Sequence, residues 1–197
     1  MSFFFTNPFG MILGILMGII SLGVLFILII SVLAVVGGPG QCTAGGPAIS
    51  ITQANSDAFQ QKWDAMDDTL DGGSPASIDL DESEVSSRAD RYLTDETDAP
   101  FGDVRVCLHD GSGEGSGTIS ILGIDVEVKV KGNMEMTGGS PVATIDDIEV
   151  GSVPGFATDV IEGIVEDAIE EGLNDIELNH DYQATLTEGN AKIDGTP

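Results

Sequence analysis

The stretch "SIDLDESEVSSRADRYL", residues 77–93, predicts a short strand that runs directly into a helix. Asp81 stands where the helix would begin, and Glu84 follows three residues later, which is the spacing of a capping box. Within the helix, apolar side chains recur at helical spacing and are expected to form its buried face. These side chains are Val85, Ala89, Tyr92 and Leu93.

A strand-rich region follows this helix. In "IDVEVKVK", residues 124–131, apolar and charged side chains alternate, which is typical of antiparallel strands with one buried face. We expect further strands within residues 103–109, 117–123, 138–153 and 176–195, with the glycine-rich residues 110–117 reversing the chain between the first two. The apolar positions expected to face the core are Ile124, Val126, Val128 and Val130.

The segment "VPGFATDVIEGIVEDAIEEGLNDI", residues 153–176, predicts a long amphipathic helix. Its apolar side chains are Phe156, Val160, Ile161, Ile164, Val165, Ala168, Ile169 and Leu173. A second helix is expected within residues 56–70, with Ser56 as its N-cap. Together these patterns predict an α+β fold, in which a twisted antiparallel sheet of about five strands packs on the long amphipathic helix.

The N-terminal part of the chain differs sharply from this region. Residues 11–36, "MILGILMGIISLGVLFILIISVLAVV", contain no charged side chain. A helix of this length is about 39 Å long, which exceeds the ~30 Å hydrocarbon core of a bilayer, so we expect a retained transmembrane helix. Gln41 precedes Cys42, where a lipoprotein signal would need a small residue, so Cys42 is not expected to carry lipid.

The expected organisation is therefore a short tail (1–10), a transmembrane helix (11–36), a flexible Gly/Pro-rich linker (37–55) and an acidic domain (56–197). We call residues 56–197 the body. Gly10, directly before the span, and Gly14, Gly18 and Ser21 within it fall on one helix face. Small residues at this spacing let a partner helix or a second copy approach closely, although glycine is also common in such helices for other reasons.

The charge of the chain excludes one class of partner. There are 33 acidic and 7 basic residues, the formal net charge is -26, and the first charged residue is Asp57. Such a body repels the phosphates of nucleic acid, so nucleic acid is excluded as a direct partner. The positive-inside rule cannot orient the span, because Lys and Arg are missing near its ends.

The chain contains two cysteines, Cys42 and Cys107. In "DVRVCLHD", residues 103–110, strand alternation places Cys107 on the face away from the expected core, where a thiol from the linker could reach it. Two readings stay open, namely a Cys42–Cys107 disulfide and two free thiols.

Motifs of catalysis or cofactor binding are not evident. The glycine-rich residues 110–117 lack the spacing of phosphate-binding loops and join two strands instead of opening a helix. His109 and His180 are far apart in sequence, and the carboxylates show no ligand spacing. We therefore expect a protein that is not an enzyme, with no metal site and no cofactor.

The order of the segments around residues 78–93, 104–111 and 148–173 resembles the membrane-anchored extracytoplasmic domains of the YpmS-like and LmeA-like kind, over residues 56–195. The matching positions are Leu80, Asp81, Glu82, Glu84, Val85, Ser86, Ser87, Gly151, Val153 and Pro154. The resemblance implies half of a tubular lipid-binding (TULIP-like) barrel, in which a sheet wraps a long helix and leaves an apolar groove. The strong acidity of the body departs from basic lipid binders.

The expected function follows from the span and this resemblance. We expect a single-pass protein of the cell membrane with its C-terminal body outside the cytoplasm, binding a lipid-like or hydrophobic ligand between helix and sheet. The alternative is a non-catalytic structural or accessory subunit that acts through its transmembrane helix and its acidic surface. The expected partners are the lipid bilayer, a hydrophobic ligand, and a partner transmembrane helix or a second copy.

Overall fold

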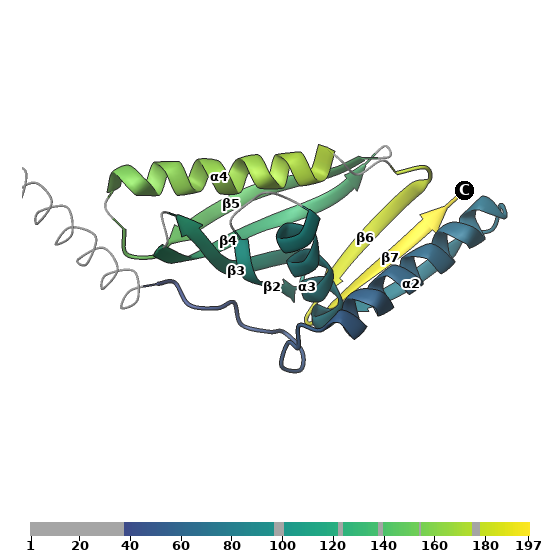
Figure 1. The fold of residues 1–197 in the computed structure, drawn as a ribbon. Helices are drawn as coiled ribbons and strands as arrows, with labels where there is room; N and C mark the ends of the chain where they lie inside the picture. Colours follow the sequence, from purple (N-terminus) through teal and green to yellow (C-terminus); the bar gives the residue numbers. More distant parts are fainter. Residues whose placement is uncertain (1–37, 97–100, 122–123, 138–139, 154, 175–177) are drawn as a thin grey trace, which may run out of the picture.

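The computed structural model of the chain describes residues 38–96, 101–121, 124–137, 140–153, 155–174 and 178–197. Seven strands in these residues form two antiparallel sheets, one of order β2-β3-β4-β5 and one of order β1-β7-β6 (Figure 1). The elements are α2 (Gln53–Asp71), β1 (Ala76–Asp81), α3 (Glu82–Arg91), a π-helical turn (Tyr92–Glu96), β2 (Phe101–His109), β3 (Ser112–Ile121), β4 (Ile124–Thr137), β5 (Ser140–Val150), α4 (Gly155–Asn174), β6 (Asp181–Thr187) and β7 (Asn190–Thr196).

The α+β class predicted from the sequence is confirmed, but the single sheet of about five strands is wrong. Strand β1 pairs with β7, and the C-terminal hairpin β6–β7 therefore builds a sheet of its own. Each sheet has an apolar face that must be covered, and each is covered by a different helix. Met66 and Leu70 of α2 pack on the smaller sheet, while α4 lies over the larger one (Figure 1).

Helix α3 lies along the outer edge of β2 and covers it with polar side chains. Three acceptors of α3, spaced four residues apart, bind alternate backbone N–H groups of β2. The bonds run from Leu108 N to Glu82 Oε1 (2.8 Å), from Val106 N to Ser86 Oγ (2.8 Å) and from Val104 N to Asp90 Oδ1 (2.9 Å). Four helical residues rise ~6.0 Å and two strand residues rise ~6.6 Å. The acceptors of α3 therefore remain aligned with the N–H groups of β2 over this length.

This contact explains why the most buried positions of α3 are polar, although Val85 of the expected apolar face also packs against the core of the smaller sheet. The buried residues of the helix are Glu82, Glu84, Ser86 and Ser87. Val85, Ala89, Tyr92 and Leu93 are only partly buried. The helix docks on a backbone edge, which requires hydrogen-bond acceptors in place of apolar side chains.

The ends of the helices are set by local hydrogen bonds. The predicted capping box is confirmed, because Glu84 N donates to Asp81 Oδ1 (2.9 Å) and Asp81 N donates to Glu84 Oε2 (3.1 Å). The predicted Ser56 cap is wrong, because α2 begins at Gln53, with Thr52 Oγ1 accepting from Asn55 N. Ser56 is 3% exposed inside the helix.

The glycine-rich residues 110–117 form less of a reversal than the sequence suggested. Strand β3 already begins at Ser112, so only Asp110 and Gly111 turn the chain between β2 and β3. A Cβ on Gly117 would lie 3.2 Å from the carbonyl oxygen of Gly102. Glycine therefore serves there to let β2 approach closely, and the stretch works as a strand.

Replacing Ser86 by alanine should destabilise the body by about 1–3 kcal/mol, because the buried Val106 N–H loses its acceptor. Ser86 is fully buried, and its Oγ also donates to the carbonyl oxygen of Val106. The matched control is Ser83→Ala, since Ser83 Oγ accepts an exposed bond from Ser50 N and should change stability by less than about 0.5 kcal/mol. Urea unfolding of the full chain in detergent, followed by circular dichroism, measures both; equal small effects would contradict the edge-covering role.

Candidate functional site

Helix α4 and the larger sheet form the layer in which the sequence places a ligand. Ile161 and Val165 are 1% and 3% exposed and pack against Ile119, Val126 and Val128, so the centre of this layer is filled by side chains. Ile164, Ile169 and Val130 are partly buried. The side chains of Ile124, Phe156 and Leu173 lie outside the described residues.

Val160 does not belong to the buried stripe, in contrast to the sequence prediction. Its side chain is 56% exposed. Each helical residue turns the side-chain direction by ~100°, and with Ile161 and Val165 pointing at the sheet, the position before Ile161 points outward. Val160 is thus an apolar side chain on the surface of the first turns of α4.

The segment between the predicted span and α2 is bound along the body. We call residues 38–52 the strap. Its backbone N–H groups donate to side chains of the larger sheet and of α3: Gly40 to Glu127 (3.3 Å), Cys42 to Ser116 (3.0 Å), Gly45 and Gly46 to Glu82 (2.9 and 3.1 Å), Ser50 to Ser83 (3.1 Å) and Thr52 to Ser87 (3.1 Å). The prediction of a flexible linker is therefore wrong for these residues.

Two glycines allow the strap to lie this close to the body. A Cβ on Gly45 would stand 2.6 Å from the carbonyl oxygen of Leu108, and a Cβ on Gly189 would stand 2.7 Å from Cα of Gly46. A larger residue at position 45 would push the backbone away from the Glu82 carboxylate. Gly45, which the sequence suggests is part of a flexible linker, thus serves a close approach.

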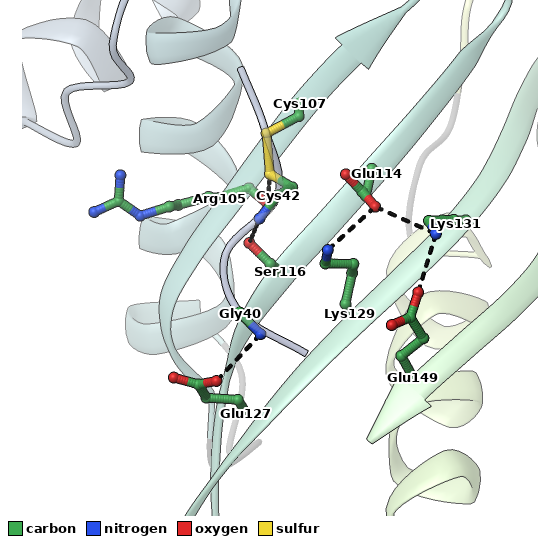
Figure 2. Close-up of polar contacts among 10 residues, drawn as sticks. All are labelled: Gly40, Cys42, Arg105, Cys107, Glu114, Ser116, Glu127, Lys129, Lys131 and Glu149. Carbon is green, nitrogen blue, oxygen red and sulfur yellow. Dashed lines mark hydrogen bonds and ion pairs between the residues drawn. A yellow bond between two sulfur atoms is a disulfide. The ribbon is translucent and has the colours of Figure 1, made fainter. Parts of the chain in front are cut away.

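A disulfide joins Cys42 of the strap to Cys107 of β2, with the two Cα atoms 6.0 Å apart (Figure 2). Of the two readings that the sequence left open, the structure has the bridge. Cys107 lies on the polar face of the strand, as predicted, yet it is fully buried. The reason is that the strap covers it.

The charged side chains beside the strap are paired with one another. Glu114 of β3 lies 3.6 Å from Lys129 and 3.7 Å from Lys131, and Lys131 lies 3.0 Å from Glu149 of β5 (Figure 2). The hydrogen bond to Glu149, and its charge, raise the pKa of Lys131, and the same contact lowers the pKa of Glu149. The row ties three strands together on the face opposite α4.

Glu82 is a buried carboxylate that joins the strap to β2. It is 2% exposed, and its two oxygens accept from the N–H groups of Gly45, Gly46 and Leu108. A buried carboxylate is stabilised in this way by several backbone donors. Sequence reasoning saw Glu82 only as part of a family-like motif, because nothing local marks it as an acceptor for distant segments.

Each of the two histidines lies beside a single carboxylate. His109 lies 3.3 Å from Glu188, and His180 lies 3.1 Å from Asp71. Within the described residues there is no group of three or more His, Cys, Asp or Glu side chains that could hold a metal ion. The Nε of Arg105 is buried, and no described residue accepts a hydrogen bond from it.

None of the helices in the described part of the chain is long and apolar enough to cross a membrane. The predicted span, with Gly10, Gly14, Gly18 and Ser21, lies outside the described residues. Comparison of the chain with protein-family models, with curated proteins and with solved structures gave no match.

Removing the disulfide by Cys42→Ser/Cys107→Ser should lower the free energy of unfolding by about 4 kcal/mol, because the bridge closes a loop of 65 residues. In unreduced wild-type protein neither cysteine should react with an alkylating agent, which mass spectrometry of the denatured chain measures. Two alkylated thiols before reduction would contradict the bridge. The single variant Cys42→Ser serves as a control that frees Cys107 for labelling.

Proposed function

We propose that this chain is a single-pass membrane-anchored envelope protein whose body, outside the cytoplasm, has a non-catalytic structural or accessory role close to the membrane. The strap carries this proposal. The predicted span ends at Val36, and Gly38 is already in contact with the body beside Glu127 and Gly151. A body held this close to an anchor is suited to act at the membrane surface.

The disulfide supports the placement of the body outside the cytoplasm. Disulfides persist in oxidising compartments and are rare where thiols are kept reduced. Cys42 and Cys107 are the two cysteines of the chain, and both are used in the bridge. The strong acidity of the body agrees with exposure to a salty environment, in which ions screen the self-repulsion.

The structural role is favoured over catalysis by the partners of the buried acids. Glu82 binds backbone N–H groups, Glu84 pairs with Lys62 at 2.7 Å, and Glu114 pairs with two lysines. These groups hold the fold together. An accessory role would also use the small-residue face of the span, Gly10, Gly14, Gly18 and Ser21, to bind a partner helix or a second copy.

A second candidate function is binding of a lipid-like ligand between α4 and the larger sheet. It is favoured by a fringe of partly buried apolar side chains around the filled centre, namely Val130, Ile148, Val150, Val153 and Ile169. An acyl chain lying along this fringe would gain about 0.8 kcal/mol per buried CH₂. The filled centre formed by Ile161 and Val165 is the reason to rank this candidate second.

The anchor is tested by membrane fractionation. The mature chain should retain residues 11–36 and should sediment with membranes after an alkaline wash, because a span of this length inserts stably. Mass spectrometry of the intact protein establishes its N-terminus. A mature chain that begins at or beyond Cys42 would show that the apolar segment is a cleaved signal.

The choice between the two functions is tested by Val165→Trp, with the exposed Val160→Trp as its matched control. If the layer is filled, Val165→Trp should cost about 1–3 kcal/mol of stability by overpacking, and native mass spectrometry should find the same lipids on wild type and both variants. A lipid that copurifies with wild type and with Val160→Trp, but is lost from Val165→Trp, would favour the ligand-binding function.

A further inference from the structure

The strap fixes which end of the body is nearest to the anchor. A Cβ on Gly38 would stand 2.9 Å from Cβ of Glu127, and a Cβ on Gly151 would lie 3.4 Å from Cα of Gly38. Glu127 is three residues into β4, and Gly151 directly follows β5. The chain therefore enters the body at the end of the larger sheet where β4 begins and β5 finishes.

Besides the strap, two connections between elements lie at this end of the sheet. Strands β3 and β4 are joined there, with Ile121 paired to Ile124. The chain passes there from β5 to the start of α4 at Gly155. We call this the strap end. Its described apolar residues include Ile121 and Val153, which are partly buried against the core, and Val160 on the first turns of α4, which is 56% exposed.

We propose that the strap end of the body rests on the surface of the bilayer, with Val160 among the side chains that contact lipid. This inference rests on the proposed membrane anchor. Only Gly37 separates Val36 from Gly38 in the sequence, so the Cα atoms of Val36 and Gly38 are at most ~7 Å apart even when the chain is fully extended. With Gly38 held against Glu127, the first residues of β4 must lie close to the end of the proposed span.

The acidic side chains at this end determine which lipid headgroups it can contact. Asp125, Glu127 and Asp159 are exposed there. Carboxylates are repelled by anionic headgroups, so the contact fits zwitterionic lipid, which the apolar side chains can enter at the interface. Anionic lipid should weaken the contact while leaving the anchor in place.

The opposite end of the same sheet provides a matched control. Met134 of β4 is 41% exposed, and it lies ten residues along the strand from Ile124, or about 33 Å. Both native cysteines are in the disulfide. A single added cysteine, Val160→Cys or Met134→Cys, is therefore the only thiol that a fluorophore can label.

Each labelled full-length chain is reconstituted into phosphatidylcholine vesicles that contain a lipid with a quencher near its headgroup. The lipid should quench the label at residue 160 severalfold more strongly than the label at residue 134. Replacing part of the phosphatidylcholine by phosphatidylglycerol should reduce quenching at residue 160. Equal quenching at the two positions, or stronger quenching at residue 134, would overturn the proposed contact. Stronger quenching at residue 160 with phosphatidylglycerol would overturn the zwitterionic preference.

The same preparation distinguishes failure of this inference from failure of the anchor. If the anchor is wrong, the labelled protein does not float with the vesicles in a density gradient. If the anchor is right and the contact is wrong, the protein floats and the two labels are quenched alike.

Discussion

The hydrogen bonding of α3 to the edge of β2 is the contact on which the rest of the structure depends. It works because the rise of four helical residues nearly matches that of two strand residues, so Glu82, Ser86 and Asp90 accept from alternate N–H groups of β2. The preceding strand β1 belongs to the smaller sheet and ends where α3 begins. Helix α3 thereby joins the two sheets, and its other polar positions, Ser83 and Ser87, hold the end of the strap.

The parts of the fold that could be predicted from the sequence are those set by local patterns. The capping box at Asp81 and Glu84 depends on residues three apart, and the alternation of Val126 and Val128 depends on the strand period. Both patterns correspond to the structure because nothing distant competes with them. The long helix α4 follows from the same kind of periodicity.

The parts that could not be predicted involve polar groups and glycines with distant partners. A helix face with Glu82, Ser86 and Asp90 looks solvated, because sequence alone does not reveal that a strand edge supplies buried donors. Gly45 resembles part of a flexible linker for a similar reason, because glycine is used both where the chain is flexible and where two segments approach closely. The division into two sheets depends on β1 pairing with β7, more than a hundred residues later, which no short pattern encodes.

The strap is held by two kinds of bond that support each other. Extended freely, its residues 38–52 could separate the body from the end of the proposed span by about 50 Å. Glu82 alone would hold it by hydrogen bonds that compete with water whenever the backbone opens, each with a modest net contribution. The disulfide at Cys42 lies three residues before Gly45 and keeps the strap beside the sheet when these hydrogen bonds open. The donors of the strap therefore stay at a high effective concentration near Glu82, and the hydrogen bonds reform. The disulfide therefore keeps the body close to the proposed span, and the hydrogen bonds of the buried Glu82 carboxylate fix how the strap lies on the body.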